Sequence, residues 1–132
     1  MIFVDTSFWI AFRNVRDARN REAISLYRSF ADRRLVTTNQ VRGETWTFMR
    51  RKSGHLEALR WLDFSGTSPR LTVATIDLGL EDQAWSWLRR HDEQAYSFVD
   101  ATSFVFMRRH GIEEAFAFDE DFSAAGFVEL RA

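Results

Sequence analysis

The sequence has 132 residues, 45% of them hydrophobic and 28% charged, which fits one globular domain over 1–132 and argues against disorder. Its net charge of −1 gives no global basic field for nucleic acid, and the absence of cysteine excludes disulfides and thiolate zinc sites. No apolar stretch reaches the ~20 residues of a membrane span. Asp5 interrupts the first apolar run, so we expect no signal peptide and a cytoplasmic protein.

The first twelve residues introduce a strand followed by a helix. Residues 1–4 form an apolar run with β-branched members, typical of a strand buried on both faces of a parallel sheet. Asp5, Thr6 and Ser7 favour a helix N-terminus, and the apolar residues 8–12 continue as a helix. Asp5 is therefore expected at the carboxyl end of the first strand, the edge at which α/β sheets bind ligands. A role as a helix cap alone would also explain this residue.

Strands and helices alternate through the rest of the chain. Short apolar runs between turn-forming residues predict four more strands, at 35–38, 71–76, 115–118 and 127–130. Capping residues followed by apolar stripes predict helices at 17–32, 39–52, 55–64, 77–91 and 100–110, with Asp17, Asn39 and Asp77 as caps. A loop is predicted at 65–70 and a turn at 119–123. This order predicts an α/β fold, a five-stranded parallel sheet with helices on both faces.

Four acidic residues fall at matching places in this pattern. Asp5 and Asp119 follow the first and fourth strands. Asp100 begins a buried helix, and Glu44 lies about one turn into the helix after the second strand. Because helix starts and strand ends share one edge of a parallel sheet, these acids are expected to converge on one crevice. Taken singly, each has a simpler explanation as a cap, a turn residue or a surface charge.

Carboxylates that meet in such a crevice need divalent cations or bound protons to hold them together. Asp5, Asp100 and Asp119 each follow apolar residues, and an apolar setting disfavours an unpaired charge. Two carboxylates about 4 Å apart repel by about 4 kcal/mol at an effective dielectric of 20. Oxygen ligands without His or Cys suit Mg²⁺ or Mn²⁺. A hard cation in this position suits phosphoryl transfer, because it activates a water and stabilises the leaving oxygen.

The acids lie in four short segments that occur in the same order in a known family. The segments are 3–7 (FVDTS), 38–44 (TNQVRGE), 97–102 (SFVDAT) and 118–122 (FDEDF). With them the chain resembles the PIN-domain ribonucleases and, among these, the VapC toxins of type II toxin–antitoxin systems. The resemblance implies a homodimeric endoribonuclease that cleaves RNA with a water activated by Mg²⁺ or Mn²⁺. The catalytic metal ligands that it implies are Asp5, Glu44, Asp100 and Asp119.

The resemblance also implies further contacts around the metal and a protein partner. Thr6 and Thr102 match positions where the family often has a hydroxyl, and Asp121 is a candidate fifth acid that reaches the metal through water. A VapB-like antitoxin would hold the toxin inactive. Aromatic residues that would line a groove for an antitoxin helix, unless they pack in the core, are Trp9, Phe12, Trp46 and Phe48. Arginines that remain candidates for contacts with RNA phosphates are Arg13, Arg42, Arg50 and Arg108.

Two other families with an Asp after the first strand fit less well. Phosphotransferases of the haloacid dehalogenase type need a second Asp two residues later, where this chain has Ser7. A response-regulator receiver needs a lysine near a late strand, and Lys52, the one lysine, lies far from that position. The remaining alternative is a PIN-like module that binds RNA or a partner without cutting. The presence of all four acids counts against this alternative.

Overall fold

A five-stranded parallel sheet forms the centre of the computed structural model, which describes all 132 residues. The strands are β1 (Ile2–Val4), β2 (Leu35–Thr38), β3 (Leu71–Ala74), β4 (Glu114–Phe116) and β5 (Val128–Glu129). Their order across the sheet is β3-β2-β1-β4-β5, and every neighbouring pair is parallel. The first strand therefore lies in the middle, where it pairs with both β2 and β4.

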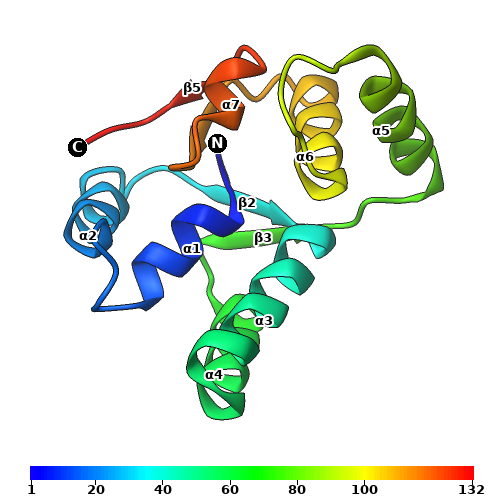
Figure 1. Cartoon of the computed structure of the whole chain (residues 1–132). Coiled ribbons are helices and arrows are strands. Elements are labelled where there is room, and N and C mark those ends of the chain that lie inside the picture. Colours follow the sequence, from blue (N-terminus) through cyan, green and yellow to red (C-terminus); the bar gives the residue numbers. More distant parts are fainter.

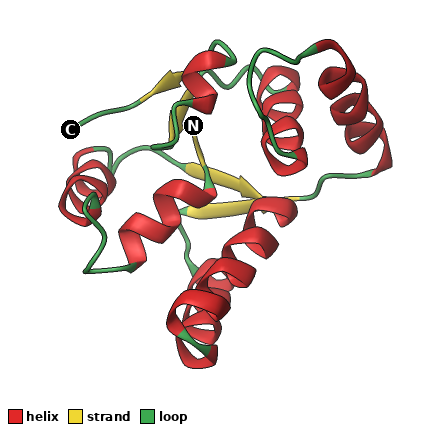
Figure 2. Cartoon of the chain, viewed as in Figure 1, coloured by secondary structure: helices red, strands yellow, loops and turns green.

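Seven helices cover the two faces of this sheet (Figures 1 and 2). They are α1 (Thr6–Arg13), α2 (Asn20–Ser29), α3 (Asn39–Ser53), α4 (His55–Thr67), α5 (Leu78–Arg90), α6 (Phe98–Arg109) and α7 (Asp121–Ala124). On one face, Phe116 of β4 stacks on Phe8 of α1 with ring centroids 4.6 Å apart. On the other, Phe3 of β1 meets Phe106 of α6 at 6.1 Å. The predicted α/β class with helices on both faces is confirmed.

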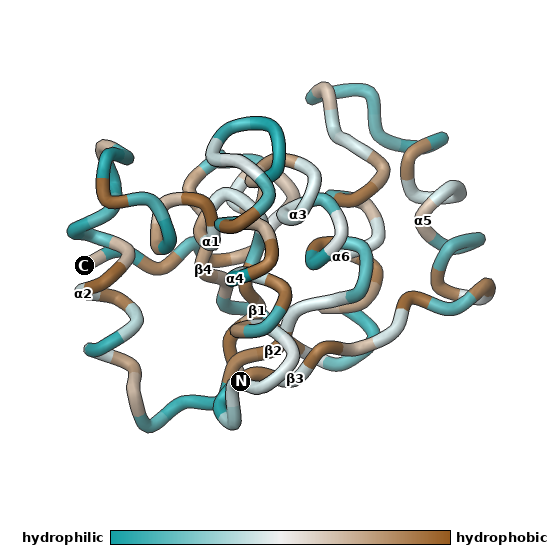
Figure 3. Tube along the Cα trace, turned by 90° about the horizontal axis from the view of Figure 1, so that it is seen from below, coloured by the Kyte–Doolittle hydropathy of each residue, from teal (hydrophilic) through white to brown (hydrophobic).

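The core surrounds the central strands. Thirty buried hydrophobic residues form one continuous cluster, and every residue of β1 and β2 is buried. Figure 3 shows the same distribution, with hydrophobic segments at β1 and β2 and hydrophilic ones along the outer turns. Burial on both faces explains why these strands appear in the sequence as continuous apolar runs instead of alternating ones. None of the helices has the length and apolar character that a membrane crossing requires.

Two predicted helix caps are wrong. Asp17 accepts a hydrogen bond from the Arg19 amide in a turn, and α2 begins only at Asn20. Thr38, not Asn39, caps α3, because its backbone is extended and its hydroxyl accepts from the Val41 amide. The Asn39 side chain instead accepts from the Ile76 amide at 2.7 Å, which ties the start of α3 to the segment after β3.

Two predicted irregular segments contain helix. The loop expected at 65–70 begins with the last turn of α4, which continues to Thr67. Ser65 is buried there, and its hydroxyl accepts from the Arg42 side chain at 2.7 Å. This contact ties the last turn of α4 to α3. The turn expected at 119–123 contains the short helix α7, whose Phe122 is buried in the core.

Candidate active site

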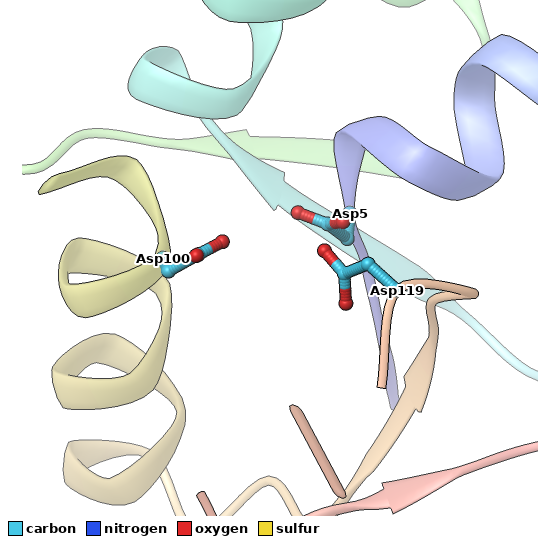
Figure 4. Close-up of side chains that lie close together, drawn as sticks. All are labelled: Asp5, Asp100 and Asp119. Atoms are coloured by element: carbon cyan, nitrogen blue, oxygen red, sulfur yellow. The ribbon is translucent and has the colours of Figure 1, made fainter. Parts of the chain in front are cut away.

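Three of the four predicted carboxylates meet at the carboxyl edge of the sheet. Asp5 follows β1, Asp119 lies after β4, and Asp100 stands in the first turn of α6. One ligand oxygen from each lies within 4.8 Å of the others. Figure 4 shows the three side chains pointing toward one another from separate elements. The strand order changes direction between β1 and β4, and α/β sheets bind ligands at such switch points.

Ser7 holds Asp5 in place. Asp5 is buried at the N-cap of α1, where its Oδ2 accepts from the Ser7 amide at 3.1 Å and the Ser7 hydroxyl at 2.7 Å. The same hydroxyl accepts from the Phe118 amide at 3.0 Å. Ser7 therefore connects Asp5 to the residue immediately before Asp119. The sequence predicts only a helix-capping role for Ser7. Its contact with Phe118 joins positions 111 residues apart and has no local signal.

A capping box holds Asp100. The Asp100 amide donates to the Ser97 hydroxyl, and the Asp100 carboxylate accepts from the Ser97 amide, both at 3.0 Å. This reciprocal pair satisfies two amides at the start of α6. Capping was the simpler explanation for Asp100 in the sequence. The structure shows that the carboxylate caps the helix and also faces the other two acids.

A strained turn carries Asp119. Its Oδ1 accepts from the Asp121 amide at 3.2 Å. Glu120, between them, has φ of 66°, the left-handed region that non-glycine residues adopt uncommonly. Such strain concentrates at functional sites, where the surrounding structure fixes it. Here it lies between Asp119 and Asp121.

Burial and the charges of neighbouring acids raise the pKa of each of the three carboxyls. For Asp5 burial is the largest cause, and the charges of Asp119 and Asp100 add to it, so its pKa lies well above the usual value in spite of the Ser7 hydrogen bonds. Burial, followed by the charge of Asp100, raises the pKa of Asp119 to about 6. Burial also raises the pKa of Asp100, against the hydrogen bonds from Ser97. The cluster therefore favours bound protons or a cation.

Two further acids lie around this group and not within it. Glu44, on α3, is outside the three-carboxylate group, but its charge contributes to the raised pKa of Asp100. The charge of Asp121 raises the pKa of both Asp100 and Asp119, and burial and the charge of Glu129 raise the pKa of Asp121 itself. These effects place both residues at the margin of the cluster.

The two predicted hydroxyls have partners inside the protein. The Thr102 side chain is fully buried and donates to the Val99 carbonyl at 2.7 Å. The Thr6 hydroxyl accepts from Thr45 at 3.3 Å, a contact that connects α1 to α3. Both hydroxyls thus support the elements that carry the acids.

The comparisons with known proteins agree with this geometry. A model of the PIN domain family matches residues 2–128. The 23S rRNA-specific endonuclease VapC20 from Mycobacterium tuberculosis, in strains CDC 1551 / Oshkosh and ATCC 25618 / H37Rv, is 54% identical over 132 residues, which are 99% of this chain and 98% of VapC20. The crystal structure of M. tuberculosis VapC20, a sarcin-ricin loop cleaving toxin, is similar with a TM-score of 0.93 and 51% identity over 100% of both chains. The chain therefore belongs to the PIN-domain family and, within it, to the VapC ribonuclease toxins.

Proposed function

We propose that this chain is a divalent-metal-dependent endoribonuclease that cleaves 23S rRNA in the sarcin-ricin loop, as its VapC20 relative does. Identity of 54% over 99% of the chain supports a shared substrate. The observation that carries the proposal is the group of three carboxylates within 4.8 Å. Three separate elements hold these charges together against their repulsion, which favours a site built for a cation.

The residues present fit a hard divalent cation such as Mg²⁺ or Mn²⁺. Asp5, Asp100 and Asp119 offer only carboxylate oxygens, which these ions prefer. Glu44 is proposed as the fourth acid, and Asp121 as one that reaches the ion through water. When bound, the cation supplies Lewis-acid polarisation of the phosphate and lowers the pKa of the attacking water. The protein's part is to hold its carboxylates ready, through Ser7 for Asp5 and Ser97 for Asp100.

Cleavage assays with matched variants test the reaction. Purified protein is incubated with ribosomes or 23S rRNA in Mg²⁺, Mn²⁺ or EDTA, and the new RNA ends are mapped by sequencing. We expect cleavage at one site in the sarcin-ricin loop, and none in EDTA. Asp5→Asn and Asp100→Asn keep side-chain shape but remove the metal-binding charge, so the rate should fall by roughly two orders of magnitude or more.

Asp82→Asn is the control for these variants. Asp82 is exposed on α5 and lies outside the acid group, so the control should cleave at the wild-type rate. Cleavage at the wild-type rate by Asp5→Asn or Asp100→Asn would contradict the assignment of the site. Binding of RNA without any cleavage, in either metal, would point to the non-cutting PIN-like module instead.

The proposal includes partners and a location. We expect a homodimer, a VapB-like antitoxin that inhibits cleavage, and action in the cytoplasm, where ribosomal RNA lies. Trp9 is fully buried and so cannot line a groove for the antitoxin, whereas Phe48 is 40% exposed. Light scattering after gel filtration tests the dimer, and co-purification with the product of the neighbouring reading frame tests the antitoxin. A neighbouring product that neither binds nor inhibits would count against the antitoxin, and not against the nuclease.

A further inference from the structure

Two cavities lie along α3, between Glu44 at the margin of the acid cluster and a basic end. A cavity of about 470 Å³ is lined by Glu44, Phe48 and Arg51. A second cavity, of about 860 Å³, lies where α1 and α3 end, and Arg13, Arg16, Phe48 and Lys52 line it. Phe48 lines both cavities and is the one residue that they share. We call the two cavities together the α1–α3 groove; the residues that define it are Glu44, Phe48, Arg51, Lys52, Arg13 and Arg16.

The groove begins beside the acids because of how its two helices are placed. Asp5 caps the start of α1, and α3 starts at the end of β2, at the same edge of the sheet. The two helices pack against each other and run away from that edge (Figure 1). From Glu44 to Lys52 the helical rise is about 12 Å. An RNA strand with its scissile phosphate at the acids would extend along this path.

The cations of the groove are free to bind a ligand, unlike several other arginines. The Arg42 side chain donates to Ser65 and to the Leu62 carbonyl, and Arg108 donates to the Ala125 carbonyl. These two candidates for phosphate contacts therefore hold the fold together. By contrast, Arg13, Arg16, Arg51 and Lys52 make no ion pair and no side-chain hydrogen bond. The guanidinium of Arg13 lies 5.2 Å from the centre of the Phe64 ring.

The two acids that line the basic end already have partners. The Asp17 carboxylate accepts from the Arg19 amide at 2.8 Å. Glu57 forms an ion pair with Arg60 on α4. Neither carboxylate is paired with a cation of the groove, so those cations remain available to an anionic ligand.

Phe48 adds an aromatic surface between the acid and basic ends. It is 40% exposed, and it belongs to none of the aromatic pairs that fill the core. Its neighbour Met49 is buried, so α3 already has its apolar contacts without Phe48. Aromatic side chains beside cations bind single-stranded nucleic acid, because bases stack on the ring while phosphates contact the charges.

We propose that the α1–α3 groove binds the RNA strand that flanks the scissile phosphate, with a base stacked on Phe48 and phosphates on Arg16, Arg51 and Lys52. This inference rests on the proposed ribonuclease function. It assigns a substrate-binding path on one side of the acid cluster. On this path Phe48 affects the binding of RNA, and hence KM, but takes no part in the chemical step.

Steady-state kinetics and salt dependence test the path. Phe48→Ala should raise KM for a sarcin-ricin loop RNA about fivefold or more, with kcat nearly unchanged, since only the stacked base is lost. The double variant Arg16→Ala/Lys52→Ala should lower the slope of log affinity against log salt by about 1.4, the value for two single-strand phosphate contacts. Affinity is measured by fluorescence anisotropy in an Asp100→Asn background, so that the RNA stays intact.

Matched controls separate binding from folding. Leu59→Ala removes an apolar side chain of similar exposure (36%) from α4, and Arg89→Ala/Arg90→Ala removes two exposed cations from the last turn of α5. Both should leave KM and the salt slope as in wild type. Lys52 lies in the last turn of α3, where a cation also stabilises the helix. Arg16 lies outside any helix, so Arg16→Ala alone tests the contact, with an expected loss of slope of about 0.7.

The possible results distinguish failure of the groove proposal from failure of the proposed function. Wild-type KM and salt slope in both groove variants, beside an active wild type, would overturn the groove and leave the proposed function intact. Normal cleavage with lost inhibition by the antitoxin would also overturn it, because the groove would then bind a protein. If wild type neither binds nor cleaves RNA, the proposed function fails and the groove proposal fails with it.

Discussion

One serine hydroxyl joins the two strand ends that carry the acids. Ser7 donates to Asp5 and accepts from the amide of Phe118, so it sets how the β1 end and the β4 end lie relative to each other. Loss of a side chain that orients a metal ligand commonly weakens metal affinity by about 10- to 100-fold. At the scale of single residues, the cluster therefore depends on Ser7 as well as on its carboxylates.

Removal of this hydroxyl should weaken metal binding. In Ser7→Ala, Asp5 loses its 2.7 Å hydrogen bond and the Phe118 amide loses its acceptor. We expect the Kd for Mn²⁺, measured by isothermal titration calorimetry, to rise about tenfold. Ser65→Ala is the control, because Ser65 is buried, accepts from Arg42 and donates to Leu62 in the same way, but on α4. An unchanged Kd in Ser7→Ala would show that Asp5 and Asp119 are positioned without it.

The acids should also make stability depend on pH in the absence of metal. The pKa of Asp119 is raised from 3.8 to about 6, so its contribution to stability is fully present below pH 3.8 and is lost as pH rises through about 6. In EDTA, wild type should therefore melt lower at pH 7.5 than at pH 5.5. Asp119→Asn should melt higher than wild type at pH 7.5, because it removes a repelled charge. Calorimetric melts that show the variant less stable at pH 7.5 would mean that the carboxylate is not repelled.

At the scale of elements, α6 combines a structural and a chemical role in its first turn. The helix is buried nearly throughout, and its capping box places Asp100 on the side that faces β1 and β4. The same side chain satisfies a backbone amide and offers an oxygen to the cluster. The position of this acid is therefore coupled to the start of the helix.

Loss of the cap should destabilise α6. Ser97→Ala leaves the Asp100 amide without its side-chain acceptor, and such substitutions cost about 1 kcal/mol. We expect the midpoint of urea unfolding to fall with an unchanged m-value, since the folded and unfolded states keep their compactness. Ser97→Thr retains the hydroxyl and should recover most of the loss. A Ser97→Ala protein as stable as wild type would indicate that the cap contributes nothing measurable.

At the scale of the whole molecule, a metal ion would link three elements at one edge of the sheet. Its ligands would come from the end of β1, the start of α6 and the loop after β4, which are far apart in the chain. Because the unfolded chain does not hold these acids together, a bound ion stabilises the folded state alone.

Added metal should therefore raise the melting temperature. At a hundredfold excess over Kd, Mn²⁺ should add about 2.7 kcal/mol to the free energy of unfolding of wild type. Asp5→Asn and Asp100→Asn should gain much less, because each lacks one charge of the site. Thermal melts at pH 7.5 with and without Mn²⁺ provide the measurement. No gain in wild type would mean that the acids do not form a cation site.

The sequence by itself determined the features that depend on local pattern. Apolar runs and capping residues indicated the alternation of strands and helices. They also placed Asp5, Asp100 and Asp119 at strand ends or helix starts, positions that parallel strands bring to one edge of the sheet. The sequence did not predict the helix cap correctly where two neighbouring side chains could both serve as the cap. Thr38 and Asn39 are both good caps, and only the contact of Asn39 with Ile76 decides between them.

The tertiary structure alone decided which of those positions meet and what surrounds them. Strand order makes β1 and β4 neighbours, so Asp5 and Asp119 come together, while Glu44 remains outside the group. The Ser7 bond to Phe118 and the exposure of Phe48 beside free cations have no local signal in the sequence. Each depends on contacts between residues far apart in the chain, whereas the periodicity of a strand or helix depends only on its own few residues.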